Sequence, residues 1–142
     1  MPTRNAEATW EGNLKEGKGS MKLGSGAFQG AYSFATRFEA APGTNPEELI
    51  GAAHAGCFSM AFSAGLAKAG YQPRRVHTSA QVHLEKVGEG FGITRIQLNT
   101  DAEIPNITET EFQRLANAAK EGCPVSKALA GVKIELQAHL AK

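Results

Sequence analysis

Apolar and polar residues alternate along several stretches of the chain, and each such stretch predicts a β-strand with one buried face. The clearest case is residues 132–140, where every second position is apolar. Residues 76–85 and 93–102 alternate in the same way, and a Gly-Glu-Gly turn typical of a hairpin lies between them. In the first third of the chain the pattern predicts shorter strands, at residues 6–10, 17–23 and 32–39.

Longer segments between these strands predict helices. Residues 46–68 have strong start and stop signals, because Asn45 can cap the first turn, Glu48 suits a capping box and Gly70 can end the helix. Two shorter helices are predicted at residues 109–121, where Thr108 and Glu111 form the capping signal, and at residues 124–130. The resulting order of strands, helix, strands, helix and strand predicts an α+β fold in which sheet packs on helix.

The long predicted helix also has the length of a membrane span. Residues 49–66 contain no Asp, Glu, Lys or Arg, and about 18 such residues is the lower limit for crossing a bilayer. Ten of them are Ala, Gly or Ser, so the segment is only weakly hydrophobic. With strands predicted on both sides, a buried central helix is the better interpretation.

Size and charge narrow the class of protein. The 142 residues predict one domain, residues 1–142, and the net charge of +1 argues against a general nucleic-acid binder. Because the N-terminus lacks the apolar core of a secretory signal, we expect a cytoplasmic protein. In that compartment a permanent disulfide is not expected, but a transient one is possible.

The chain has two cysteines, and their chemistry depends on whether the fold brings them together. Cys57 lies in the middle of the long helix, and Cys123 precedes Pro124 at a predicted helix start. Two buried structural thiols are one interpretation. A redox pair is the other, and it requires Cα atoms within about 7 Å. By the helix dipole alone Cys123 would be the more acidic thiol, whereas Cys57 needs a nearby cation.

Arg37 is the candidate cation, because it lies on a predicted strand that is otherwise apolar or small. A solvated Arg37 paired with Glu39 is the simpler alternative. Glu47 can complement the dipole at the start of the long helix. His54 shares a helix face with Cys57, but together with Cys123 these offer at most three soft ligands, so no metal site is predicted.

Two motifs then identify a family. The run from Gly43 to Met60, GTNPEELIGAAHAGCFSM, and the run from Gly122 to Ser126, GCPVS, closely resemble the osmotically inducible protein C family, as does the early Trp-Glu-Gly phrase at Trp10. The resemblance covers nearly the whole chain. It implies an intertwined homodimer in which sheets wrap around long central helices. It also implies a thiol-dependent peroxidase of the oxidative and osmotic stress response that reduces organic hydroperoxides, and hydrogen peroxide more weakly.

The resemblance also assigns roles to residues. Cys57 would be the peroxidatic thiol and Cys123 the resolving one, with Arg37 and Glu47 as the charged pair that activates the thiol. No metal or prosthetic group is implied, and an external dithiol or lipoyl-type reductant would regenerate the enzyme. An apolar pocket formed by side chains such as Phe34, Phe58 and Met60 would favour organic peroxides. A non-catalytic small-ligand-binding protein and a redox sensor of the same fold are the alternatives.

Helix geometry adds one expectation. Glu47 and Cys57 are ten residues apart, which is about 15 Å along a straight helix. A single Arg37 therefore cannot easily contact both in one subunit. If all three meet, we expect Glu47 to come from the partner chain, in a composite site at a dimer interface.

Overall fold

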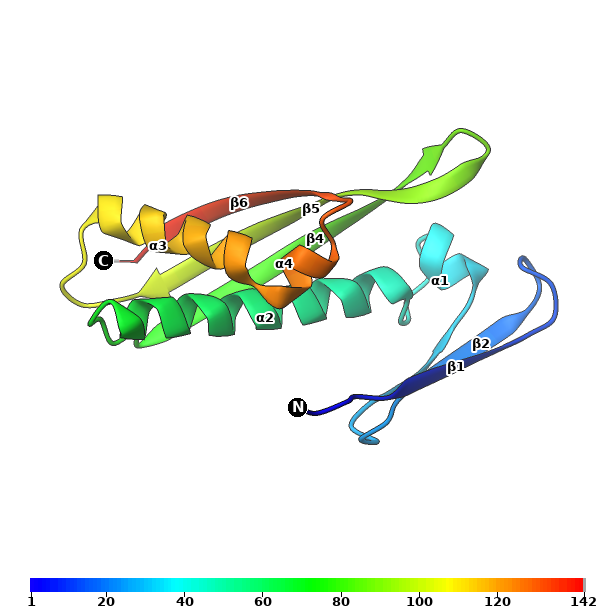
Figure 1. Ribbon diagram of the computed structural model, residues 1–142. Helices are drawn as coiled ribbons and strands as arrows, with labels where there is room; N and C mark the ends of the chain where they lie inside the picture. Colours follow the sequence, from blue (N-terminus) through cyan, green and yellow to red (C-terminus); the bar gives the residue numbers. More distant parts are fainter. Residues whose placement is uncertain (142) are drawn as a thin grey trace. The chain divides into compact units, whose positions relative to one another are not determined.

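The computed structural model describes residues 1–141. The chain forms two compact units, the first from Met1 to Leu49 and the second from Ile50 onward. Each unit has its own three-stranded sheet, and the elements of each are coloured along the sequence in Figure 1.

The first unit is an antiparallel sheet followed by one turn of helix. Its strands β1 (Ala6–Glu11), β2 (Lys18–Leu23) and β3 (Gln29–Tyr32) pair in the order β1-β2-β3. The predicted strands at 6–10 and 17–23 are confirmed. The rings of Trp10 and Tyr32 pack in a tilted arrangement with centroids 5.4 Å apart, and a Cβ atom at Gly19 would clash with both rings.

The strand predicted at residues 32–39 is wrong. β3 ends at Tyr32, and α1 (Phe34–Phe38) follows directly. Ser33 and Thr36 form a reciprocal capping box, in which the Thr36 N–H donates to Ser33 Oγ at 3.2 Å and the Ser33 N–H donates to Thr36 Oγ1 at 2.9 Å. This local pairing stabilises a helical turn despite the alternation of side chains, so Arg37 lies on a helix.

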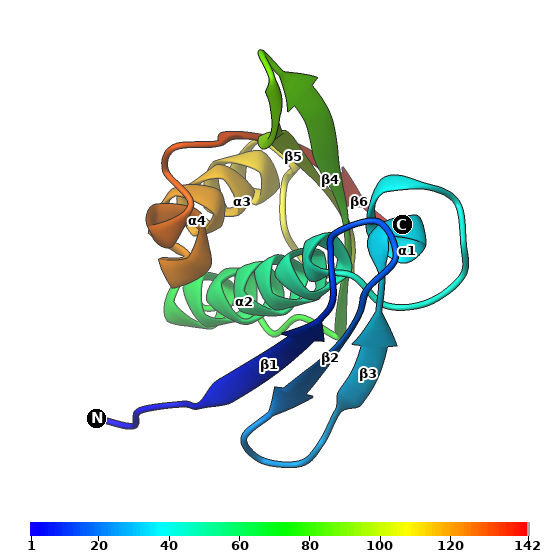
Figure 2. The same ribbon diagram turned by 90° about the vertical axis from the view of Figure 1, so that its right-hand side faces the viewer.

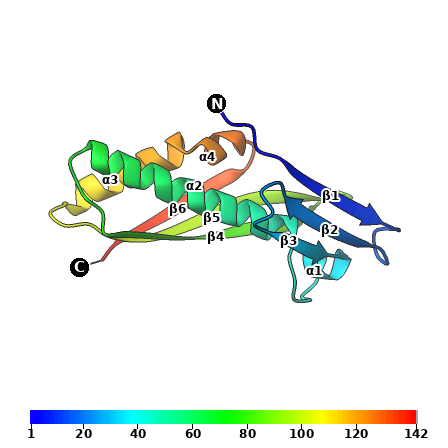
Figure 3. The same ribbon diagram turned by 90° about the horizontal axis from the view of Figure 1, so that it is seen from below.

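The second unit contains the sheet β4-β5-β6, with β4 (Arg75–Val87), β5 (Gly90–Glu103) and β6 (Lys133–Leu140). β4 and β5 form the predicted antiparallel hairpin, whereas β5 and β6 are parallel. Parallel strands need a long crossover, and here α3 (Glu109–Gly122) and α4 (Pro124–Ala128) supply it. Figures 2 and 3 show these helices on one face of the sheet, beside the second-unit part of α2.

α2 (Pro46–Lys68) has the predicted bounds and begins with the predicted cap, in which the Glu48 N–H donates to Asn45 Oδ1 at 2.8 Å. Its inward face forms the core of the second unit, where Phe58, Phe62 and Leu66 are fully buried. The Phe62 ring lies 5.5 Å from that of Phe112 on α3. Helix and strand packing therefore hold the middle of α2 in a rigid position.

The opposite face of α2 is exposed within the chain. It carries small and apolar side chains, and Met60 is 77% exposed. By length and composition α2 is the one helix among residues 1–141 that could cross a membrane, with 28% of its apolar window buried. Core helices of soluble proteins satisfy the same criterion. The predicted buried helix is thus covered by its own chain on one side only.

Candidate active site

The two cysteines meet in the second unit. Cys57 lies in the middle of α2, and Cys123 lies at the junction of α3 and α4, where it is the C-cap of one helix and the N-cap of the other. Their Sγ atoms are 2.8 Å apart although 66 residues separate them, and both thiols are free. Cys123 is fully buried, whereas Cys57 is only partly buried. The arrangement can form a disulfide with little movement.

The surroundings of the two sulfurs differ in their effect on acidity. Burial raises the pKa of the Cys57 thiol, and the hydrogen bond with Cys123 raises it further. For Cys123 burial also acts to raise the pKa, but hydrogen bonds with the Cys57 thiol, with the backbone N–H and hydroxyl of Ser126 and with the Val125 N–H together lower it. Within this chain, Cys123 is therefore the more acidic of the two thiols.

A second buried contact continues from the cysteine pair. His54 Nε2 lies 2.7 Å from Ser126 Oγ, with His54 fully buried and Ser126 7% exposed. Burial lowers the pKa of His54, so its imidazole is neutral. Ser126 is a site residue that the sequence analysis missed. The available signal was its place three residues after Cys123 in the first turn of α4, because that spacing returns to the cap residue.

Arg37 and Glu47 form a bidentate ion pair in the first unit. Arg37 Nε donates to Glu47 Oε1 and Arg37 Nη2 donates to Oε2, each at 3.0 Å. Arg37 therefore pairs with Glu47 and not with Glu39 as in the simpler alternative. Both residues belong to one chain, and the expected composite site, in which Glu47 belongs to the partner of the chain that supplies Cys57, stays a prediction. If the pair meets a cysteine of another chain, both members do so together.

Aromatic side chains surround Arg37. The guanidinium carbon lies 5.2 Å from the centroid of the Phe38 ring. A pocket opens beside it within the first unit, lined by Trp10, Leu14, Tyr32, Ser33, Phe34, Arg37 and Phe38. Phe34 thus lines a pocket as expected. Phe58 does not, because it is fully buried in the core cluster, and Met60 lies on the exposed face of α2.

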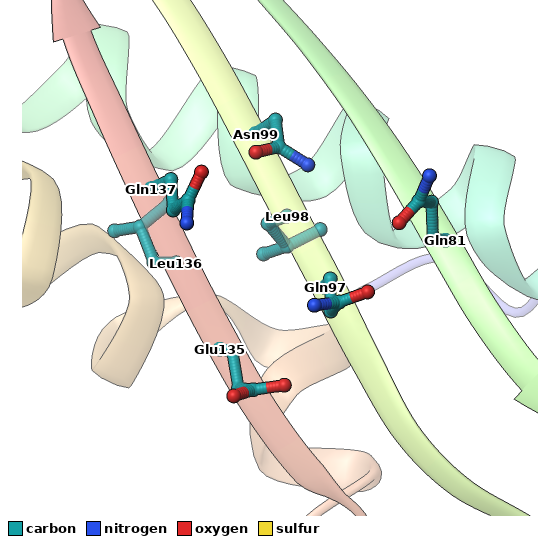
Figure 4. Close-up of a pocket in the computed structure, with 7 residues that line it drawn as sticks. All are labelled: Gln81, Gln97, Leu98, Asn99, Glu135, Leu136 and Gln137. Carbon is teal, nitrogen blue, oxygen red and sulfur yellow. The ribbon is translucent and has the colours of Figure 1, made fainter.

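A further depression lies on the polar face of the second sheet. Figure 4 shows it lined by amides and one carboxylate, from Gln81, Gln97, Asn99, Glu135 and Gln137, together with Leu98 and Leu136. This lining contains no cysteine, serine, histidine or lysine. The two cysteines of the second unit lie instead among the helices.

Comparison with known proteins agrees with this geometry. The sequence profile of the OsmC-like protein family matches residues 39–137. The chain is 50% identical over 127 residues to peroxiredoxin OsmC of Escherichia coli (strain K12), with 89% of each chain covered. It is 36% identical over 102 residues to the organic hydroperoxide resistance protein OhrB of Bacillus subtilis (strain 168), covering 70% of this chain and 74% of that protein.

A solved structure shows the same fold. The organic hydroperoxide resistance protein from Elizabethkingia anophelis superimposes with a TM-score of 0.71 at 26% identity, and the match covers 100% of this chain and 97% of the other. A thiol pair between α2 and the junction of α3 and α4, in an α+β fold with two three-stranded sheets, is thus accompanied by close similarity in sequence. The chain belongs to the OsmC-like protein family.

Proposed function

We propose that the protein is a cytoplasmic, thiol-dependent peroxidase that reduces organic hydroperoxides, and hydrogen peroxide more weakly, as part of a stress response. The observation that carries the proposal is the 2.8 Å separation of the Cys57 and Cys123 sulfurs. Names of relatives support it, since these include a peroxiredoxin and an organic hydroperoxide resistance protein. The whole chain acts as one peroxidase domain in this proposal.

We infer the roles of the two thiols from how exposed each sulfur is. Cys123 has the lower pKa, but its side chain is fully buried and a peroxide cannot reach its sulfur. Cys57 is partly exposed. Its surroundings within the chain raise the pKa of its thiol, and a cation beside the sulfur would lower that pKa and stabilise the thiolate. Cys57 is therefore the peroxidatic residue and Cys123 the resolving one.

The reaction has two oxidative steps. The Cys57 thiolate attacks one oxygen of the peroxide bond, the O–O bond breaks, and the alkoxide leaves with a proton as an alcohol while Cys57 becomes a sulfenic acid. The Cys123 thiolate then attacks the Cys57 sulfur and displaces hydroxide, which leaves as water. The product is a Cys57–Cys123 disulfide. An external dithiol, such as one of lipoyl type, returns it to two thiols without a metal or prosthetic group.

The Arg37–Glu47 pair activates Cys57 from a second copy of the chain. Glu47 and Cys57 lie about 15 Å apart along α2, so the pair cannot easily serve the cysteine of its own helix. In an antiparallel pairing of two α2 helices that cross near Ala52, the start of one lies beside the middle of the other. The Arg37 guanidinium then hydrogen-bonds to Glu47 on one side. On its other side it stabilises the Cys57 thiolate and polarises the peroxide.

The exposed face of α2 is the surface that a second copy covers. Ala52, Ala53, Gly56 and Met60 are all exposed there, and an uncharged, apolar strip of this kind on a 23-residue helix is poorly suited to water. Small side chains let a second helix approach closely. This homodimer explains why the central helix is apolar all round but buried on one side in its own chain.

The pocket beside Arg37 accounts for the preference for organic substrates. Its aromatic walls, which include Trp10, Tyr32 and Phe34, suit an alkyl or aryl group, and the guanidinium suits the peroxide oxygens. Hydrogen peroxide has no organic group to bury there. Its reduction would therefore lack this part of the binding free energy.

The decisive test is to count thiols before and after one equivalent of cumene hydroperoxide, and to locate any bridge by mass spectrometry. We expect two thiols to be lost and a Cys57–Cys123 disulfide to form within seconds. Unchanged thiols would indicate a small-ligand-binding protein of the same fold. Oxidation over hours, together with a tightly bound protein partner, would indicate a redox sensor.

A further inference from the structure

His54 and Ser126 form a buried pair that the proposed reaction has not yet used. His54 lies on α2, one turn before Cys57, and Ser126 lies on α4, one turn after Cys123. Their contact of 2.7 Å joins the same two helices as the cysteine pair. Polar groups this deeply buried are costly unless they serve a defined contact.

The direction of the hydrogen bonds follows from chemistry. The Ser126 hydroxyl hydrogen-bonds to the Cys123 sulfur, and it must donate in order to stabilise a thiolate. Its oxygen is then free to accept from His54 Nε2–H. His54 Nδ1 is buried and has no hydrogen-bond partner among the described residues, so the imidazole is held through Ser126 alone. The chain of contacts runs from His54 through Ser126 to Cys123.

Among residues 1–141, no charged side chain lowers the pKa of Cys123. On α2, Cys57 contacts the Cys123 sulfur directly, and His54 contacts Ser126. On α3, Lys120 and Glu121 pair with each other at 3.7 Å, and on α4 Lys127 is exposed. Among the described residues, the interactions that lower the pKa of Cys123 all come from neutral groups.

Burial also decides which sulfur of the disulfide a reductant can reach. Cys123 is fully buried and Cys57 is partly exposed. An incoming thiolate therefore attacks Cys57, and Cys123 must leave as a thiolate. Thiol–disulfide exchange is faster when the leaving thiol has the lower pKa.

We propose that Ser126 and His54 are positioning residues that make Cys123 the leaving group when an external thiol reduces the disulfide, so that the reductant bonds to Cys57. The inference rests on the proposed function for its place in a catalytic cycle. In the step itself, the reductant thiolate forms a bond to Cys57 Sγ, the Cys57–Cys123 bond breaks, and the electron pair goes to Cys123. A second thiol of the reductant then displaces Cys57, so that the dithiol is oxidised by two electrons and the protein is reduced.

The first experiment identifies the sulfur that is attacked. The full-length protein is oxidised with diamide, which forms the disulfide without a peroxide, and is treated briefly with glutathione. Acid then stops the exchange, and free thiols are alkylated after the protein has been unfolded, so that the buried Cys123 sulfur is accessible to the reagent. Peptide mapping is expected to find glutathione on Cys57 and the alkyl group on Cys123. Glutathione on Cys123, or a failure of diamide to link the two cysteines, would overturn the proposal.

The second experiment measures the effect of the pair on Cys123. In a Cys57→Ser background, Cys123 is the one remaining cysteine, and the ultraviolet absorbance of its thiolate as a function of pH gives its pKa. We expect Ser126→Ala to raise that pKa by about 1, because a hydrogen bond to a charged group is lost. In the two-cysteine protein the same change should slow reduction of the diamide-formed disulfide by dithiothreitol by about threefold or more. Ser126→Thr keeps the hydroxyl and should restore both values.

Matched variants separate this role from general packing. Ser59→Ala removes another hydrogen-bonded hydroxyl of α2, bonded to Thr78 at 2.8 Å and not to sulfur, and should leave both values unchanged. His54→Gln places an amide N–H near the position of Nε2 and should resemble the wild type, whereas His54→Met should resemble Ser126→Ala. Equal behaviour of the Ser126→Ala and Ser59→Ala variants would refute the inference. None of these experiments uses a peroxide. Their outcome is therefore independent of whether the protein has the proposed peroxidase activity.

Discussion

Arg37 holds Glu47 through two parallel hydrogen bonds of 3.0 Å, and Glu47 is 8% exposed. The contact joins the single turn of α1 to the first turn of α2 within one chain. A carboxylate this buried is stable only with its partner, so Arg37 has a structural role in addition to the proposed catalytic one.

We expect loss of Arg37 to destabilise the fold. Arg37→Met leaves the Glu47 charge buried and unpaired, and should lower the free energy of unfolding by about 1–3 kcal/mol, reduced from fully buried pairs because Arg37 is partly exposed. Urea denaturation measures the change. Adding Glu47→Gln removes the unpaired charge, so the double variant should be more stable than the sum of the single effects predicts. If the effects of the two substitutions on the free energy of unfolding were strictly additive, the ion pair would not contribute to stability.

Substitution of each cysteine should stop the reaction at a different step. Cys57→Ser removes the thiol that meets the peroxide and should abolish consumption of cumene hydroperoxide. Cys123→Ser should permit one turnover that stops at the Cys57 sulfenic acid, because no second thiol is present to condense with it. Rapid mixing followed by mass spectrometry with a sulfenic acid trap distinguishes the two. The opposite pattern would reverse the assignment of roles.

Gly56 tests the proposed homodimer. A Cβ atom at Gly56 would meet no atom of its own chain within 4 Å, so a side chain there fits the single chain sterically. Gly56→Lys should therefore preserve the fold but place a charge against the second α2 helix, and so shift the protein from dimer to monomer. Sedimentation velocity measures the shift. Ala118→Lys, an exposed position on α3, is the matched control, and equal behaviour of the two variants would argue against α2 as the interface.

Phe34 tests the organic-peroxide pocket. Its ring centroid lies 4.9 Å from that of Phe38, and both line the pocket beside Arg37. Phe34→Ala removes part of the apolar wall and should raise KM for cumene hydroperoxide by about tenfold, while the rate with hydrogen peroxide changes little. Phe28→Ala, in the same unit but outside the pocket lining, should affect neither substrate selectively.

Stability should fall in mildly acidic solution because of His54. Burial lowers the pKa of His54 in the folded state below the unfolded value of about 6.5. As pH falls through about 6.5, the unfolded chain therefore binds a proton that the folded chain does not, and the free energy of unfolding decreases. Urea titrations between pH 7.5 and 5 should show this slope. His54→Gln should flatten it, and an unchanged slope in that variant would assign the effect to other groups.

Much of the fold could be predicted from local pattern. The bounds of α2 were predicted correctly, since a cap at Asn45 and a stop at Gly70 are signals within a few residues of the ends. The long hairpin and the last strand were also predicted, because alternation reports burial of one face directly. The strand predicted at residues 32–39 is wrong because the capping box between Ser33 and Thr36 stabilises a helical turn there, despite the alternation of side chains.

The sequence by itself determined most of the elements, the family and most of the candidate residues, because these depend on nearest neighbours and on motifs of contiguous residues. Only the tertiary structure decided which of those residues meet. It placed Cys123 against Cys57, Arg37 against Glu47, and Ser126 against His54. Spacing along the chain carries no information on such contacts, since the packing of α2 against α4 and of α1 against the start of α2 sets the distances between side chains far apart in sequence.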